Sequence, residues 1–199
     1  MNNLVEEYEK RKKDLKEHNK KFLNKNEEDI FKEFMFCLLT PQSNAQRCWK
    51  AVEEITALNE FSYKNINDIL KTKTRFHNKK TERIVNSKQT FSKIKPLLSS
   101  NDIKDTRNKI SEIVNGYGLK EASHFLRNIG KSNNEIAILD RHILRNLFKE
   151  GIIKEQKIKS NKHYLEIEKN FLDFAKSNKI PADELDLLWW SNENGELFK

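Results

Sequence analysis

The chain has 199 residues, of which 36% are hydrophobic and 34% are charged, so it can build the core of one domain or of two small ones. Its net charge of +8 and its pI of about 9.3 indicate a polyanionic partner. No apolar run approaches the roughly 20 residues that a membrane span needs, and the first residues carry no apolar signal segment, so we expect an intracellular, cytoplasmic protein without a membrane partner.

Helical periodicity extends along nearly the whole chain. Apolar residues recur at spacings of three and four and strand signals are nearly absent, which predicts an all-α fold. We expect Thr40 or Ser43 to cap the third helix, and Pro181 suits a helix start. The predicted helices, in chain order, cover residues 3–22, 27–39, 45–55, 66–70, 84–91, 105–114, 120–129, 140–151, 164–174 and 181–190.

The two cysteines, Cys37 and Cys48, lie in apolar helical segments, and we expect both thiols to be buried. Two thiols cannot supply the four ligands of an iron–sulfur cluster. No Cys/His spacing resembles a zinc site. The sequence therefore predicts chemistry without a metal and without a cofactor.

A Gly-x-Gly turn, Gly116-Tyr117-Gly118, separates the predicted helices 105–114 and 120–129. Two glycines allow positive φ and the close approach of a phosphate. The backbone amides that follow lie at a helix N-terminus, which favours anions. This pattern is typical of a helix-hairpin-helix motif that binds a DNA phosphate.

Two ionisable residues accompany the hairpin. Lys120 lies in the first turn of the second helix, where the helix dipole disfavours a cation. A fold that lowers its pKa from about 10.4 would give a neutral amine, which could attack C1′ of a deoxyribose, expel the base and form a Schiff base. Asp140 precedes a helix and could stabilise positive charge on the sugar. The alternatives are a phosphate contact for Lys120 and a simple N-cap for Asp140.

A base must leave the duplex stack before an enzyme can excise it. Phe76 and the Trp189–Trp190 pair could hold such a base, although each ring could also belong to the core. Adjacent helical residues point about 100° apart, so one tryptophan can be buried while the other lines a cavity. Gln42, at a helix boundary, could fill the gap in the duplex or be an ordinary loop residue. His142 could contact a phosphate or be a partly buried surface histidine.

These residues resemble the helix-hairpin-helix DNA glycosylase superfamily. More narrowly, four segments look like the archaeal-type 8-oxoguanine DNA glycosylase/AP lyases, the second Ogg class: 38–43 (LLTPQS), 75–78 (RFHN), 118–130 (GLKEASHFLRNIG) and 195–199 (GELFK). The resemblance covers most of the chain. It implies two α-helical domains with an active-site cleft between them, one formed by 1–35 with 150–199 and the other by 36–149, with the hairpin at about 106–130.

The resemblance also implies roles for single residues. Lys120 corresponds to the Schiff-base nucleophile and Asp140 to the catalytic acidic residue. Phe76 and Trp190 correspond to the aromatic pair that sandwiches the damaged guanine. Lys199 corresponds to a terminal lysine at the base pocket.

Further positions correspond to contacts with DNA. Gly116 and Gly118 belong to the phosphate-binding hairpin, and His142 matches a phosphate-contacting histidine of the superfamily. Gln42 matches the wedge position of the related endonuclease III-like enzymes. The stretch 131–135 is about two residues longer than the family pattern, and we expect it to bulge as a surface loop.

The resulting hypothesis is a monomeric, bifunctional glycosylase/AP lyase of base excision repair that acts on duplex DNA containing 8-oxoguanine. One alternative is the same chemistry on another oxidised base, because specificity depends on pocket shape. A second alternative is a helix-hairpin-helix protein that binds DNA without chemistry. A third, a basic all-α interaction protein, explains the charge alone.

Overall fold

The computed structural model describes residues 3–195, 197 and 198. In this part of the chain there are eleven α-helices, one short 3-10 helix and no strand, so the prediction of an all-α fold is confirmed. The chain divides into two compact units, 1–24 with 126–199, and 25–125. The domain boundaries expected from the sequence, 35/36 and 149/150, differ from these limits and stay a prediction.

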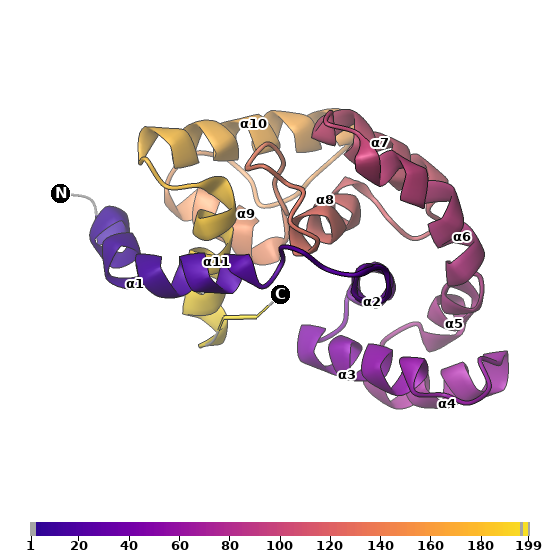
Figure 1. Ribbon diagram of the computed structural model, residues 1–199. Helices are drawn as coiled ribbons and strands as arrows, with labels where there is room; N and C mark the ends of the chain where they lie inside the picture. Colours follow the sequence, from indigo (N-terminus) through magenta and orange to yellow (C-terminus); the bar gives the residue numbers. More distant parts are fainter. Residues whose placement is uncertain (1–2, 196, 199) are drawn as a thin grey trace. The chain divides into compact units, whose positions relative to one another are not determined.

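The 25–125 unit is a set of short helices joined by tight turns (Figure 1). Within it, α4 packs beside α5, and α3 packs beside both α2 and α4. Its elements are α2 (Glu27–Leu39), α3 (Ala45–Thr56), α4 (Tyr63–Lys73), α5 (His77–Val85), α6 (Ser87–Ile94), the 3-10 helix Lys95–Ser99, α7 (Ile103–Ile113) and most of α8 (Leu119–Asn128).

An aromatic cluster fills the core of this unit. The Phe34 ring lies 5.5 Å from Phe91, 5.4 Å from Tyr117 and 5.8 Å from Phe125, measured between ring centroids. The Tyr117 hydroxyl also donates a hydrogen bond of 2.7 Å to the Phe34 carbonyl. A buried tyrosine needs such a partner for its hydroxyl. The turn between α7 and α8 is therefore anchored to α2 by both packing and a hydrogen bond.

Two local predictions were wrong in this unit. Asn44, and not Thr40 or Ser43, caps α3: its side chain accepts from the Arg47 amide at 3.0 Å. The single helix predicted around 84–91 is two helices that meet at Asn86. Asn86 has a ψ of 0°, and its side-chain amide donates to the Glu82 carbonyl at 2.8 Å, because Asn competes with the helix for backbone partners.

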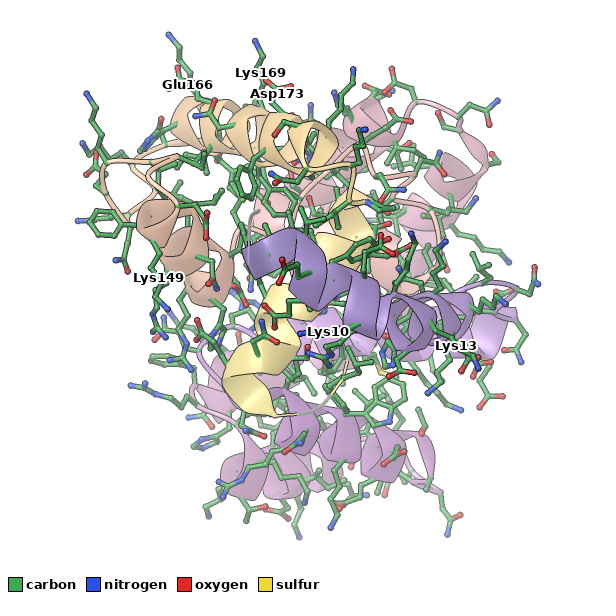
Figure 2. All side chains as sticks on the ribbon, turned by 90° about the vertical axis from the view of Figure 1, so that its left-hand side faces the viewer. Lys10, Lys13, Lys149, Glu166, Lys169 and Asp173 are labelled. Atoms are coloured by element: carbon green, nitrogen blue, oxygen red, sulfur yellow. The ribbon has the colours of Figure 1, made fainter. Side chains whose placement is uncertain are left out.

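The unit that contains both termini is built on longer helices, and its remaining elements are α1 (Asn3–Lys20), α9 (Arg141–Lys149), α10 (Asn161–Ser177) and α11 (Ala182–Asn194). In it, α1 runs beside α11, which also packs on α9 and α10 (Figure 1). The Tyr8 hydroxyl of α1 donates to the Glu184 carboxylate of α11 at 2.7 Å. Charged side chains of α10, including Glu166, Lys169 and Asp173, project away from the ribbon (Figure 2).

The long connection between α8 and α9 is only partly a surface loop. Residues 133–135 are exposed, as expected, and Asn133 and Asn134 both have positive φ. Ser132 is buried, contrary to the expectation for the whole stretch, because its hydroxyl hydrogen-bonds the Asp183 carboxylate. The Asn134 side chain also accepts from the Asp183 amide at 3.0 Å, so the extra residues are tied to the start of α11.

Cys37 and Cys48 are both buried, as predicted. Among the residues that the structure describes, no three His, Cys, Asp or Glu side chains lie together so that they could hold a metal ion. No helix within 3–195 has the length and apolar character needed to cross a bilayer.

Candidate functional site

The hairpin loop links α7 to α8, and its two glycines differ. Gly116 has a φ of +102°, and a Cβ placed on it would lie 2.6 Å from the Arg83 side chain, so glycine is favoured there. Gly118 is not in the left-handed region, so only Gly116 uses the positive φ that glycine allows. Its N–H donates to Glu121 Oε2 at 3.1 Å, and its carbonyl accepts from Ala122 at 3.1 Å, so Gly118 serves as the N-cap of α8.

The start of α8 presents open backbone donors. The amides of Leu119, Lys120 and Glu121 have no hydrogen-bond acceptor among the described residues. The first amides of any helix lack intrahelical partners, and together with the helix dipole they favour an anion. The hairpin therefore has the donors that a phosphate oxygen requires.

Lys120 is held at this helix start and is not an extended surface side chain. Its ammonium forms an ion pair with Glu121 Oε1 at 2.8 Å, and 26% of its side chain is exposed. Glu121 is itself fixed, because its second oxygen accepts from Gly118. The amine thus lies beside the anion-binding amides, and it must leave Glu121 before it can attack a substrate.

Phe76 is exposed, so the alternative that its ring belongs to the core was wrong. Its side chain is 56% exposed, it adopts a φ of 57° directly before α5, and the Arg75 guanidinium lies 5.6 Å from the ring centre. A bulky residue in the left-handed region is a true outlier, and such strain gathers at functional sites. The ring has a face available for stacking.

Gln42 shares this unusual backbone conformation. It is exposed, with a φ of 54°. The neighbouring Ser43 hydroxyl accepts from the Arg75 amide at 2.9 Å, so the structure brings the Gln42 turn and the Phe76 turn together. Both residues were predicted from the sequence, but no local sequence signal indicates this contact between distant segments.

A surface hollow of about 380 Å³ lies beside the hairpin loop. Two cationic side chains, Lys79 and Arg83, contribute to it, and the Arg83 side chain also covers Gly116. The residues around the hollow are Leu38, Lys79, Glu82, Arg83, Asn86, Thr90, Val114 and Asn115. Cations next to the open amides extend a surface that suits phosphates.

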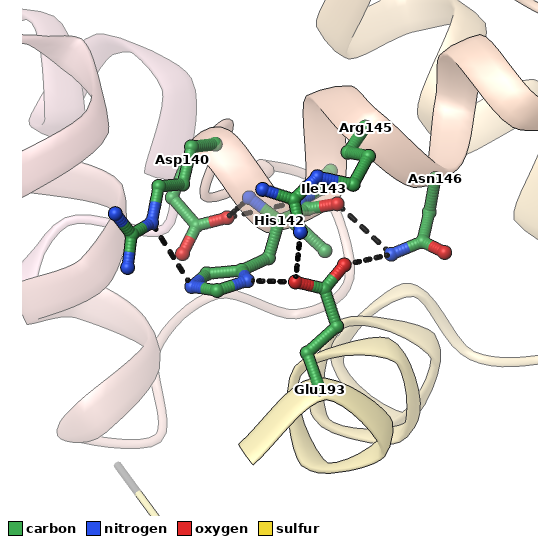
Figure 3. Close-up of polar contacts among 7 residues, drawn as sticks. Asp140, His142, Ile143, Arg145, Asn146 and Glu193 are labelled. Atoms are coloured by element: carbon green, nitrogen blue, oxygen red, sulfur yellow. Dashed lines mark hydrogen bonds and ion pairs between the residues drawn. The ribbon is translucent and has the colours of Figure 1, made fainter.

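Asp140, in the unit with the termini, caps α9. Its Oδ1 accepts from the His142 amide at 2.8 Å and from the Ile143 amide at 2.9 Å (Figure 3). Its Oδ2 has no hydrogen-bond partner among the described residues. One oxygen therefore fixes the carboxylate, and the other is available to a substrate.

His142 is a partly buried histidine, with 13% of its side chain exposed. Its Nδ1 bonds the Glu193 carboxylate, which also accepts from Arg145 at 2.7 Å and Asn146 at 3.4 Å (Figure 3). Burial acts to raise the pKa of Glu193, but the hydrogen bond and charge of His142 and the charge of Arg145 outweigh it and lower the pKa. Glu193 was not predicted from the sequence, because it is 51 residues from His142. A phosphate contact of His142 stays a prediction.

One tryptophan of the pair is buried, as predicted, and the prediction that the other lines a cavity stays a prediction. Trp189 is buried and stacks on Phe174 with centroids 5.7 Å apart. Trp190 is half-buried and stacks on Phe198 at 6.2 Å. Lys199, the predicted terminal contact of the base pocket, lies outside the described residues.

Asp186 is a second residue that the sequence analysis missed. It lies one turn before Trp190 in α11, and its carboxylate is 3.4 Å from the Arg127 guanidinium in a buried pair. Burial raises the pKa of Asp186 to about 7; Arg127 acts in the opposite direction, while Asp140 and Asp183 raise the pKa further. A buried carboxyl that titrates near neutral pH beside Asp140 is typical of a functional region.

An Asp186→Asn variant tests this environment through stability. Between about pH 4 and pH 7 the folded protein retains the Asp186 proton, whereas the unfolded chain, with a pKa of about 3.9, has lost it. As the pH rises through this range, the free energy of unfolding of the wild type should therefore fall relative to that of the variant, by up to about 1.4 kcal/mol per pH unit. Urea denaturation at several pH values measures the difference, and a difference that does not change with pH would contradict the raised pKa.

An all-α fold, a hairpin that carries Lys120 and a fixed Asp140 are typical of the helix-hairpin-helix DNA glycosylases. Residues 9–180 match the family model described as 8-oxoguanine DNA glycosylase. The chain is 38% identical to the 8-oxoguanine DNA glycosylase/AP lyase of Fusobacterium nucleatum, over 94% of this chain and 90% of that protein. It belongs to the 8-oxoguanine DNA glycosylase family, as the sequence resemblance indicated.

Solved structures of 8-oxoguanine DNA glycosylases are similar to this chain along nearly its whole length. The Methanocaldococcus jannaschii 8-oxoguanine glycosylase/lyase, in complex with a 15mer DNA containing 8-oxoguanine, superposes with a TM-score of 0.87 at 32% identity, over 98% of this chain and 99% of that chain. The 8-oxoguanine DNA glycosylase of Thermotoga maritima gives a TM-score of 0.88 at 30% identity, over 98% and 96% of the two chains.

Proposed function

We propose that this chain excises 8-oxoguanine from duplex DNA and then cleaves the strand by β-elimination. The observation that carries the proposal is Lys120, an amine fixed in the first turn of the second hairpin helix, beside open backbone amides. Membership of the family and similarity to a structure in complex with DNA containing 8-oxoguanine support the substrate. The proposed chemistry uses side chains of the chain together with water.

The reaction begins when Lys120 Nζ, as a free amine, attacks C1′ of the damaged nucleotide. The C1′–N9 bond breaks, the base leaves with the bonding electrons and takes up a proton, and the sugar ring opens to a Schiff base on Nζ. Loss of a proton from C2′ then expels the 3′ phosphate, and water releases the lysine. The open Oδ2 of Asp140 supports these steps by stabilising the positive charge that develops at the sugar.

The hairpin binds the DNA backbone in this proposal. The open amides at the start of α8 donate hydrogen bonds to a phosphate oxygen, and Gly116, which lies against the Arg83 side chain, is a candidate for a DNA contact in the same loop. Lys79 and Arg83 add charge beside the loop. The net charge of +8 supports duplex DNA as the partner, and Gln42 and His142 are candidates for further DNA contacts.

The damaged base is expected to lie between aromatic rings. Phe76 is an exposed ring; Trp190 is half-buried and stacks on Phe198, and Lys199 is the candidate polar contact. Trapping with borohydride on duplexes that carry 8-oxoguanine or an oxidised pyrimidine tests the substrate directly. Covalent complex with 8-oxoguanine supports the proposal, whereas complex with the pyrimidine lesion alone would favour the alternative lesion.

A Phe76→Ala variant should lose excision of 8-oxoguanine by about tenfold to a hundredfold, because stacking on one aromatic ring contributes roughly 1–3 kcal/mol per base. Cleavage of a preformed abasic site should fall less, since no base remains to be stacked. Single-turnover rates on the two substrates measure this difference.

Phe148→Ala is the matched control, because Phe148 is another exposed phenylalanine, at 45%, and has no proposed contact with the base. It should keep wild-type rates. Phe76→Trp keeps an aromatic ring and should therefore excise 8-oxoguanine faster than Phe76→Ala. If Phe76→Ala lost both activities equally, Phe76 would not be a base-stacking residue.

A further inference from the structure

Lys80 is a buried lysine of α5 with an unusual set of partners. Its side chain is 2% exposed. Its ammonium donates to the Leu39 carbonyl at 2.7 Å, the Pro41 carbonyl at 2.9 Å and the Ser43 hydroxyl at 2.8 Å. An ammonium has three N–H donors, and all of them are used by one short segment, 39–43. None of the acceptors is a carboxylate.

The same residue is linked to the Phe76 turn. Its backbone amide donates to the Phe76 carbonyl at 3.1 Å, which is the first hydrogen bond of α5. The Ser43 hydroxyl, which accepts from the Lys80 ammonium, also accepts from the Arg75 amide at 2.9 Å. Through these bonds Lys80 and Ser43 connect the segment before α3 to the turn before α5.

The two connected turns each contain a strained residue. Gln42 and Phe76 have φ values of 54° and 57°, a conformation that costs a residue with a side chain roughly 1–2 kcal/mol. Such residues persist where the surrounding structure fixes them. The Lys80 ammonium binds the carbonyl before Gln42 and the hydroxyl after it, while the Lys80 amide binds Phe76 itself.

We propose that Lys80 is a positioning residue: its buried ammonium holds the Gln42 turn and the Phe76 turn together, in the arrangement that receives an extruded base. This inference rests on the proposed function, because it assigns Phe76 and Gln42 to the lesion. Lys80 itself touches neither the sugar nor the base in this account. Its effect passes through the backbone of the two turns.

The surroundings of the Lys80 ammonium disfavour its charged form. Burial lowers the pKa of Lys80 to about 8, Cys48 acts in the opposite direction, and the positive charges of Arg83, Arg75 and Lys120 lower it further. A partly desolvated ammonium without a carboxylate partner does little for stability compared with an apolar side chain of similar length. Its hydrogen bonds to three points of one turn explain a lysine at this position.

The test is a Lys80→Met variant, which keeps the length of the side chain and removes its donors. Two substrates are compared under single-turnover conditions: a duplex with 8-oxoguanine, and the same duplex with a preformed abasic site. The abasic site has no base to be received by the two turns. We expect base excision to fall at least about tenfold more than abasic-site cleavage, a difference of about 1.4 kcal/mol in activation free energy. Borohydride trapping on the abasic duplex gives the active fraction.

Two further variants make the test specific. Lys50→Met removes an exposed lysine of α3 and should leave both rates unchanged. Ser43→Ala removes one acceptor only, and it should shift the ratio of the two rates in the same direction but less. Because the two residues act through one network, the Lys80→Met/Ser43→Ala double variant should lose less than the sum of the two single effects.

Equal loss on both substrates in Lys80→Met and in Ser43→Ala, or no loss in either, would overturn the inference. If Lys80→Met does not fold, Ser43→Ala decides through its ratio of rates. A wild-type protein that acted on neither duplex would instead refute the proposed function, so the two failures are distinct.

Discussion

A Lys120→Gln variant is expected to form no covalent complex with DNA when borohydride is added, and to lose base excision by more than about a thousandfold. The amide of glutamine cannot form a Schiff base, whereas it keeps the approximate size of the side chain. Binding of the undamaged duplex should change little, because the hairpin amides and Gly116 remain in place. Gel separation of the reduced complex and a fluorescence binding titration measure the two quantities.

Lys109→Gln is the control for this variant. Lys109 lies in α7 and, like Lys120, forms an ion pair of less than 3 Å with a helix carboxylate, here Asp105 at 2.7 Å. Its loss removes one positive charge from the first hairpin helix and should leave the covalent complex intact. If the Lys120→Gln variant still gave the wild-type yield of reduced complex, another amine would be the nucleophile.

An Asp140→Asn variant should have the second large effect, a fall in excision of about a hundredfold to ten-thousandfold, with the free energy of unfolding nearly unchanged. Asparagine caps a helix as well as aspartate does, so its side-chain oxygen can still accept from His142 and Ile143. What it lacks is the negative charge at the open Oδ2 position. Single-turnover excision and urea denaturation of the same preparation separate the two effects.

Asp102→Asn is the matched control, because Asp102 caps α7 through the Asp105 amide at 2.9 Å and has no proposed role in chemistry. It should keep both stability and excision. An Asp140→Asn variant that excised 8-oxoguanine at the wild-type rate would show that Asp140 is a helix cap and nothing more.

Local signals in the sequence were sufficient for several parts of the site. Lys120 lies in the first turn of α8 and Asp140 caps α9, as predicted, because both positions follow from a glycine pair or a capping residue beside an apolar repeat. The burial of one tryptophan of the pair followed from helical geometry in the same way. These features depend on neighbours within a few residues.

The parts that were missed depend on distant residues. Ser43 was one of two predicted caps of α3, yet its hydroxyl binds Lys80 and Arg75, which lie 37 and 32 residues away. Glu193 reaches His142 across 51 residues. The left-handed backbone of Gln42 and Phe76 is strained, so local preference argues against it. Such contacts become visible only when the fold brings the segments together.

The identity of the amine that attacks the sugar decides whether the proposed reaction is correct. Borohydride is added during the reaction on a duplex containing 8-oxoguanine, so that the Schiff base is reduced to a stable bond. Proteolysis and mass spectrometry of the DNA-linked peptide then identify the amine. We expect the sugar remnant to be attached to Lys120, in the peptide that spans the start of α8. Attachment to a different amine, or rapid excision of 8-oxoguanine with no attached peptide at any time point, would contradict the proposed reaction.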